Sequence, residues 1–330
     1  MTILVTGGAG YIGSHMSHEL ADLGRPIVVV DNLTTGFRWA LPETARLVVG
    51  DIGDQDLIRA TIDRYGVTGI IHFAGSIVVP ESVADPLGYY LNNTVKSRSL
   101  IEAAVISKVK HFIFSSTAAV YGMAKEMPVR ETTGLEPMSP YGSSKLMTEI
   151  MLRDTAFAHP EFNYVALRYF NVAGADPRGR TGQSTKGATH LIKVACETAL
   201  GKRPGMEVFG TDYDTPDGTC VRDYIHVTDL ARAHVAALGH LEKGGKSDIF
   251  NCGYGKGYSV LEVLDAVRRV SGKPMNVKMS DRRPGDPAMI VAASEKIRAT
   301  LAWQPALDDL DGIVANALAW EDALGKRNKT

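Results

Sequence analysis

The sequence predicts an α/β protein, with a doubly wound parallel sheet in its first half and a smaller C-terminal α/β part. Three observations predict this fold class. Short apolar runs alternate with helical patterns through the first half. The first run leads into three glycines spaced GxxGxxG, and the second run ends in an aspartate. Together these features indicate a Rossmann-type sheet, which binds its ligands at the carboxyl ends of the strands.

The expected elements follow the apolar runs along the chain. Strands are expected at 2–6, 27–31, 46–50, 69–74, 111–116 and 164–169, and long helices at 92–107 and 143–157. From about residue 175 the pattern changes: 174–188 is polar and glycine-rich, which is typical of a loop or lid. A helix near 188–200, a strand near 206–209 and a loop over 210–220 follow. We expect one domain over 1–175, with a return around 222–252, and a second, mainly substrate-binding domain over 176–330.

The glycine-rich turn predicts a site for a dinucleotide. Gly7, Gly10 and Gly13 stand between a buried strand and a helix, where glycine permits a tight turn and lets the backbone approach a pyrophosphate. Asp31 ends the next strand, where a carboxylate accepts hydrogen bonds from a ribose diol and repels a 2′-phosphate. The alternative for Asp31 is an ordinary loop or helix-cap aspartate. With the glycine turn before it, the sequence favours NAD over NADP.

Tyr141 and Lys145 are the candidate acid–base pair. They stand four residues apart at an expected helix start, so both side chains lie on one face of the helix. A phenol ionises near pH 10, and a nearby ammonium favours the phenolate and lowers its pKa. The spacing therefore predicts a tyrosine that moves a proton at neutral pH. Alone, the same spacing fits an exposed Tyr and Lys on a helix surface.

Composition excludes several other classes of protein. The net charge of −1 gives no support for a nucleic-acid groove or an anionic membrane surface. No apolar stretch is long enough to span a bilayer, and the first strand begins at once, so we expect no membrane and no signal peptide. Cys196, Cys220 and Cys252 lack pairing or metal spacing and are expected to be reduced thiols of a cytoplasmic protein. His15 and His18 share a helix face without further ligands, so we expect surface residues and no metal site.

The motifs together resemble the extended short-chain dehydrogenase/reductase family. The general matches are at 6–13 (TGGAGYIG), 31–33 (DNL), 50–52 (GDI), 72–75 (HFAG), 114–122 (FSSTAAVYG) and the Tyr141–Lys145 pair. Finer matches resemble the UDP-sugar 4-epimerases of that family, at 81–83 (ESV), 89–93 (YYLNN), 167–171 (LRYFN), 217–219 (DGT), 221–227 (VRDYIHV) and 282–286 (RRPGD). The matches cover nearly the whole chain.

The resemblance implies roles for individual residues. The catalytic group is Tyr141, Lys145 and Thr117, which takes the position of the family's catalytic Ser/Thr. The implied NAD contacts are the glycine turn, the ends of three strands, the segment after the fourth strand and parts of the catalytic group: Gly7, Gly10, Tyr11, Ile12, Gly13, Asp31, Asn32, Leu33, Thr34, Thr35, Gly36, Asp51, Ile52, Phe73, Ala74, Gly75, Ser76, Ile77, Asn92, Thr117, Tyr141, Lys145 and Phe170. The implied UDP-sugar contacts are Thr117, Tyr141, Asn171, His190, Leu191, Phe209, Arg222, Arg283 and Asp286.

The second half supports a nucleotide-sugar ligand by its own chemistry, because arginine matches a diphosphate well. For Arg222 and Arg283 the alternative is a surface ion pair, such as Arg222 with Asp223. The sequence offers many expected contacts to UDP and few obvious contacts to the hexose. This distribution suits a sugar that must turn over while its UDP stays bound.

The resemblance implies an enzyme that inverts C4 of UDP-glucose or UDP-galactose through a 4-keto sugar, with tightly bound NAD. A 4-epimerase of UDP-GlcNAc, UDP-glucuronate or UDP-arabinose has the same chemistry and stays open, as does a non-catalytic NAD-binding regulator. A 4,6-dehydratase needs an Asp-Glu pair after the Ser/Thr, where this chain has Ala118 and Ala119. Relatives of this type usually form a homodimer through two helices, here 92–107 and 143–157.

Overall fold

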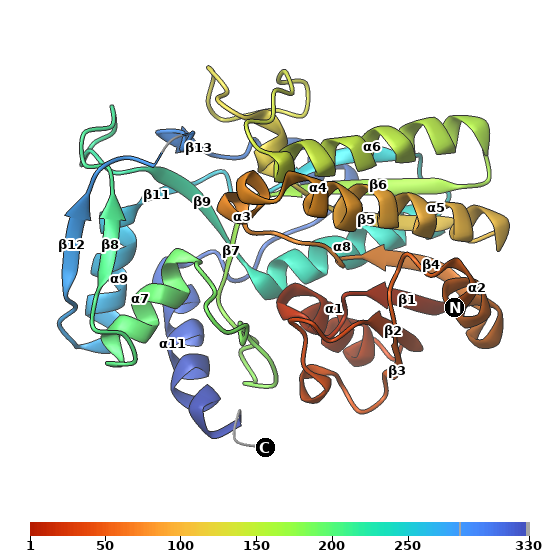
Figure 1. The fold of residues 1–330 in the computed structure, drawn as a ribbon, viewed down its shortest axis with the longest axis horizontal. Helices are drawn as coiled ribbons and strands as arrows, with labels where there is room; N and C mark the ends of the chain where they lie inside the picture. The colour runs from red at the N-terminus through yellow and green to blue at the C-terminus, as the bar shows by residue number, and fades with distance from the viewer. Residues whose placement is uncertain (284, 328–330) are drawn as a thin grey trace.

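A seven-stranded parallel sheet forms the centre of the larger part of the molecule (Figure 1). The computed structural model describes residues 1–283 and 285–327. The strands stand in the order β10-β6-β5-β4-β1-β2-β3, and each neighbouring pair is parallel. Their bounds are β1 (Thr2–Thr6), β2 (Ile27–Asp31), β3 (Arg46–Val49), β4 (Val67–His72), β5 (His111–Thr117), β6 (Asn163–Tyr169) and β10 (Asp248–Cys252). The doubly wound α/β fold is confirmed, and the six expected strands are present with small shifts at their ends.

Helices cover both faces of this sheet, and alternate strand residues point to one face or the other. On one face, α1 (Tyr11–Asp22) packs against α8 (Val227–Glu242), and both cover Ile3 and Val5 of β1. On the other face, α2 (Gln55–Tyr65), α5 (Lys96–Ile106) and α6 (Pro140–Ala158) cover the opposite side, including Leu4. Burial of both faces explains why the strands are continuous apolar runs.

Two long helices begin earlier than the apolar pattern indicated, because polar caps precede them. The helix expected from residue 92 continues a run made of α3 (Val79–Ala84), α4 (Pro86–Tyr89), a π-helical turn η2 (Tyr90–Val95) and α5. Asp85 accepts a hydrogen bond from the Gly88 amide at 3.0 Å and thereby starts α4. In the same way, Ser139 caps α6 at the Gly142 amide, and Pro140 is the first residue of the helix.

The smaller part lies beside the carboxyl ends of the large sheet and has two small sheets (Figure 1). One contains β11, β9 and β13, with β7 paired to β9, and the other pairs β12 with β8. Helices α7, α9 and α11 pack against one another next to them. The bounds are β7 (Asn171–Ala173), α7 (Leu191–Ala199), β8 (Met206–Phe209), β9 (Val221–His226), β11 (Gly257–Ser259), α9 (Val260–Ser271), β12 (Val277–Ser280), β13 (Met289–Ile290), α10 (Glu295–Leu301) and α11 (Leu310–Arg327), with short 3-10 turns η1 (Arg38–Ala40) and η3 (Ala118–Tyr121).

The expectation that His15 and His18 are surface residues is wrong. Their residues are 2% and 8% exposed, respectively. His15 donates from Nδ1 to the Tyr11 carbonyl at 2.8 Å, and His18 donates from Nε2 to the Ala40 carbonyl at 3.1 Å. The error arises because the chain returns to cover helix α1, which helical spacing alone does not indicate. In the described part of the chain, no three His, Cys, Asp or Glu side chains gather in a way that suits a metal ion.

None of the helices described in residues 1–283 and 285–327 is both long and apolar enough to cross a bilayer. The three cysteines are buried and free.

Candidate active site and cofactor site

The site lies where the strand order of the large sheet reverses. From β1 the chain passes to β2 on one side, whereas β4 pairs with β1 on the other side. The helices that leave β1 and β4 therefore diverge and open a crevice at the carboxyl ends of these strands, which is the usual ligand site of such sheets. The glycine turn and residues 73–77 border it directly.

The glycine turn after β1 is built for a close-lying anion. Gly7 has a φ of +66°, and a Cβ there would lie 2.6 Å from the Ala74 nitrogen. A Cβ on Gly13 would lie 2.1 Å from the Gly7 carbonyl oxygen. Gly10 begins helix α1 without any side-chain cap, so the first amides of the helix point to the crevice with the positive end of the helix dipole. These features fit the pyrophosphate of NAD.

Asp31 holds the loops that surround the expected adenosine ribose. Its carboxylate accepts from the Ala9 amide at 2.9 Å and from the Leu33 amide at 2.8 Å. Gly36 lies so close to Ala9 that a Cβ would be 2.8 Å from its carbonyl carbon. Asp31 at the end of β2 thus connects to the glycine turn, and both border the crevice. Residues 32–36 continue this border. Farther along the edge, Asp51 pairs with Lys96 and accepts from the Gly53 amide at 2.8 Å, and Ile52 is buried.

The segment after β4 is held by two neighbouring asparagines. Asn92 donates to the Ser76 hydroxyl at 2.9 Å, as suits its expected supporting role. Asn93, which the sequence reasoning missed, accepts from the Ser76 amide at 2.8 Å and donates to the Ser76 carbonyl at 2.9 Å. It also donates to Ser144 at 3.1 Å and so connects this segment to helix α6. The expected contact Ile77 is half-exposed at the end of the segment.

Helix α6 and strand β5 bring the catalytic candidates together. Thr117 ends β5, Tyr141 and Lys145 lie on α6, and all three are buried. The Thr117 hydroxyl is close enough to the phenol of Tyr141 to influence the pKa of that phenol. Lys145 donates from Nζ to the Ser115 carbonyl at 2.9 Å and lies 4.9 Å from the centre of the Phe114 ring. A Cβ on Gly75 would be 3.7 Å from the same Nζ, so Lys145 faces the crevice floor.

The pKa of Tyr141 does not follow the simple expectation from its lysine neighbour. Burial raises it above the ordinary phenol value of 10.0, and the nearby Thr117 hydroxyl has the opposing effect. Burial lowers the pKa of Lys145 to about 8, and the nearby carboxylate of Glu149 opposes this change. The ammonium therefore remains the main form of Lys145 at pH 7.

A buried ion pair lies directly beneath this catalytic group and was also missed. Glu149 on α6 and Arg168 on β6 have side chains that are each 3% exposed, with Arg168 Nη2 2.6 Å from Glu149 Oε2. Glu149 also accepts from Ser116, which stands between Ser115 and Thr117. The sequence did contain a signal for Glu149. It follows Lys145 by four residues, as Lys145 follows Tyr141, so all three lie on one face of the helix.

The expected UDP-sugar residues come together in two groups on the smaller part. Arg222 pairs with Asp286, not with Asp223, and the Arg283 guanidinium lies 3.7 Å above the Phe209 ring. The second group, Asn171, His190 and Leu191, lines a hollow that is partly open to solvent. Tyr11 of helix α1, an expected NAD contact, lines the same hollow. Phe170, the expected neighbour of the nicotinamide, is buried in a cluster with residues of η3 and β13.

A glycine-rich dinucleotide turn followed by a buried tyrosine and lysine in a Rossmann-type crevice defines the class of short-chain dehydrogenases and reductases. Comparison with known proteins agrees and is more specific. Residues 3–253 match the model of the NAD dependent epimerase/dehydratase family. A UDP-glucose 4-epimerase of Azospirillum brasilense is 56% identical over 322 residues, which cover 98% of this chain and 92% of that protein.

Solved structures give the same result. The UDP-glucose 4-epimerase of Brucella ovis in complex with NAD has a TM-score of 0.94 at 44% identity, covering 96% of this chain and 97% of that one. The UDP-glucose 4-epimerase of Stenotrophomonas maltophila with bound NAD and formylated UDP-arabinopyranose has a TM-score of 0.96 at 36% identity, covering 99% of both chains. The chain therefore belongs to the NAD-dependent epimerase/dehydratase family and groups there with the UDP-glucose 4-epimerases.

Proposed function

We propose that this protein is an NAD-dependent enzyme that interconverts UDP-glucose and UDP-galactose by inverting C4 of the sugar. The observation that carries the proposal is the buried group of Thr117, Tyr141 and Lys145 at the switch-point crevice, within a chain of this family. When bound, NAD supplies reversible hydride transfer at C4. The glycine turn, Asp31 and the segment 73–77 would hold it.

The chain's own residues would manage the proton and the sugar. Tyr141 is positioned to take the proton from the O4 hydroxyl, directly or through the hydroxyl of Thr117. The positive charge of Lys145, fixed by the Ser115 carbonyl, would stabilise the phenolate form of Tyr141, which becomes the neutral phenol when it accepts the O4 proton. Return of the same proton to the other C4 epimer then needs no second acid.

The UDP part of the substrate would be held by the smaller part of the molecule. Arg222 and Arg283 provide the positive charge for a diphosphate, and Asp286 and Phe209 orient them. The two domains expected at 1–175, with the return around 222–252, and at 176–330 would thus divide the work between cofactor and UDP. A 4-keto sugar held by its UDP end is free to turn and present its other face.

Replacement of Tyr141 by Phe tests this proposal. We expect kcat for UDP-galactose, without added cofactor, to fall by about 10²- to 10⁴-fold, because a positioned acid–base group is removed. UDP binding by calorimetry and the NAD content after gel filtration should stay unchanged. Tyr65→Phe, at the end of α2, is the matched control. Undiminished epimerisation by the Tyr141 variant would refute the assignment.

The range of sugars is tested with a panel of UDP-hexoses, UDP-N-acetylhexosamines, a UDP-uronate and UDP-pentoses. Our proposal predicts the highest kcat/KM for UDP-glucose and UDP-galactose. A preference for another class of sugar would keep the mechanism and change the substrate. Retained NAD without turnover of any member would instead favour a non-catalytic regulator.

We further propose a cytoplasmic homodimer. Leu91 and Val95 on η2 and Met147 and Ile150 on α6 are 40% to 54% exposed, although these two elements pack side by side. Such apolar side chains on two adjoining helices suit a second copy of the chain, which would bury them in a helical bundle. Three free, buried cysteines are typical of a reducing compartment.

A further inference from the structure

The segment between β7 and α7, residues 174–190, returns to the first turns of helix α1. Tyr11 donates from its hydroxyl to the Gly174 carbonyl at 2.7 Å. The hydroxyls of Ser14 and Thr181 lie 2.7 Å apart, and both residues are completely buried. The returning chain is therefore packed onto the helix whose N-terminus faces the expected pyrophosphate.

The same segment packs closely against residues of the expected cofactor site, around a small depression in the surface. Gly182, Ser184 and Thr185 form one side of it, and the other side includes Gly10 and Thr35, two of the residues expected to contact NAD. Gly182 is held against the ring of Trp320 on α11, since a Cβ there would lie 2.5 Å from that ring. These positions place backbone and hydroxyl groups of 182–185 beside the glycine turn.

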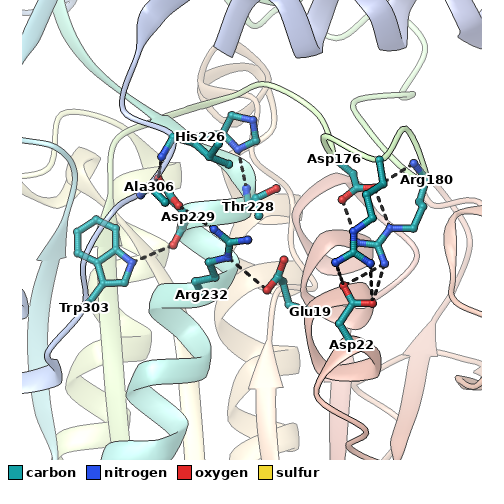
Figure 2. A network of polar contacts seen from close by, with 12 residues as sticks. Glu19, Asp22, Asp176, Arg180, His226, Thr228, Asp229, Arg232, Trp303 and Ala306 are labelled. Carbon is teal, nitrogen blue, oxygen red and sulfur yellow. Dashed lines mark hydrogen bonds and ion pairs between the residues drawn. The ribbon is translucent and has the colours of Figure 1, made fainter. Parts of the chain in front are cut away.

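One arginine fastens this segment to helix α1. Arg180 donates from Nε and Nη2 to Asp176 at 2.8 and 2.9 Å, and from Nη1 to Asp22, at the end of α1, at 2.9 and 3.1 Å. Figure 2 shows the guanidinium between the two carboxylates. Asp176 is 5% exposed in its side chain, and its backbone closes the loop by pairing with Thr181. We call Asp176, Arg180 and Asp22 the arginine clip.

We propose that residues 182–185 are a further wall of the NAD site, and that the arginine clip holds this wall closed and slows the release of NAD. The inference rests on the proposed NAD site. A catalyst that returns its hydride to the same sugar has no need to exchange NAD, so a closed wall suits the reaction. Opening the wall would require that Arg180 leave Asp22 and that the buried Ser14–Thr181 contact separate.

Arg178 provides a matched control within the same segment. It also pairs with Asp22, at 2.9 Å, but its side chain is 65% exposed, compared with 24% for Arg180. Exposed ion pairs contribute little, whereas the partly buried Arg180 joins two carboxylates, Asp176 and Asp22, and so restrains the chain. Loss of either arginine changes the net charge equally, so a difference in NAD release between the two variants does not come from net charge.

The experiment measures NAD release from the purified holoenzyme for wild type, Arg180→Gln and Arg178→Gln. Released NAD is consumed by an excess of an NAD-dependent dehydrogenase with its substrate, and the reduced product is followed by absorbance. We expect at least about tenfold faster release from Arg180→Gln, which corresponds to about 1.4 kcal/mol. Arg178→Gln should release NAD at the wild-type rate. Added NAD should restore turnover to Arg180→Gln preparations that have lost it.

Asp22→Asn, on the helix side of the clip, tests the contact without altering the loop. If the two groups act through each other, the double variant Asp22→Asn/Arg180→Gln releases NAD no faster than Arg180→Gln alone. Equal release from the Arg180 and Arg178 variants, with a wild type that retains NAD and epimerises, would refute the clip and leave the proposed function intact. A wild type that neither retains NAD nor epimerises would refute both.

Discussion

The buried pair of Glu149 and Arg168 permits a quantitative prediction. In Arg168→Met, the Glu149 carboxylate keeps Ser116 but loses its contacts to Arg168 Nε at 3.0 and 3.2 Å and to Nη2 at 2.6 Å. Tyr121 also loses the donor at 3.0 Å from its hydroxyl. Because the side chain of Glu149 is 3% exposed, water cannot replace these donors. Removal of one partner of a buried pair costs about 3–5 kcal/mol of unfolding free energy.

Urea unfolding of the apo and NAD-loaded protein, followed by circular dichroism, measures this loss. With a slope of about 3 kcal/mol per molar urea, the midpoint should fall by about 1–2 M. The double variant Arg168→Met/Glu149→Leu should recover part of the loss, since no uncompensated charge is left inside. Arg153→Met on the outer side of α6 is the control, because its pair with Asp154 is exposed, and should leave the midpoint unchanged.

A loss below about 1 kcal/mol in Arg168→Met would contradict the reasoning, because a desolvated carboxylate would then be tolerated without its partner. A double variant that is less stable than the single variant would contradict it too. In that case the attraction between the two charges would stabilise the fold by more than the free energy needed to remove both charges from water.

Three further predictions concern the turn, a buried acid and the helix surface. Gly13→Ala places a Cβ 2.1 Å from a backbone carbonyl of the turn, so the NAD content after gel filtration should fall to near zero. Gly134→Ala is the control and should keep NAD, because the space around Gly134 is open. Full NAD content in the Gly13 variant would contradict the role of the glycine turn. Burial raises the pKa of Asp223 from 3.8 to about 6, and the folded state therefore binds this proton more tightly than the unfolded state. Unfolding free energy should thus fall by about 2 kcal/mol as pH rises from about 4 to 6. A parallel dependence in Asp223→Asn, measured by urea midpoints, would refute this source. Leu91→Glu should shift the sedimentation coefficient from dimer to monomer, and Met279→Glu, equally apolar and 51% exposed on β12, should not; a Leu91 variant that stays dimeric would exclude this surface.

The fold and the glycine turn were predictable because their signals are local. A strand buried on both faces must be apolar over its whole length, and a backbone that approaches a pyrophosphate needs glycine. The helix starts were shifted because Asp85 and Ser139, short polar caps, lie outside the apolar pattern. These are differences of a few residues at boundaries, and they leave the site in place.

Spacing identified Tyr141 and Lys145 as neighbours but could not predict their electrostatics. The direction of the pKa change at Tyr141 depends on burial, which raises it, and on Thr117, which lies 24 positions earlier in the chain. Lys145 is directed to the Ser115 carbonyl and the Phe114 ring of β5. Both effects need the packing of α6 against β5, which no pattern within the helix contains.

The long polar segment 174–188 was predicted as a loop or lid, and its path explains two errors at once. Helical spacing placed His15 and His18 at the surface because it treats α1 as a helix with one free face. The returning segment and the η1 region occupy that face, through Ser14–Thr181 and His18–Ala40. A loop that buries a helix in this way is bound at many points, which supports the proposed wall and not a freely moving lid.

The distribution of polar groups supports tight binding of the two nucleotides, NAD and UDP, and looser binding of the sugar between them. Charged groups that fit UDP lie on β9 and beside β8, and the cradle for NAD lies after β1. Between them, the catalytic region contributes Thr117, Tyr141 and the apolar ring of Phe170. A 4-epimerase must let the 4-keto sugar turn over between two hydride transfers, so few fixed contacts to the sugar ring are an advantage. Firm binding of UDP and of NAD would supply the affinity, so the proposed turnover of the 4-keto sugar would need no further contact to the sugar.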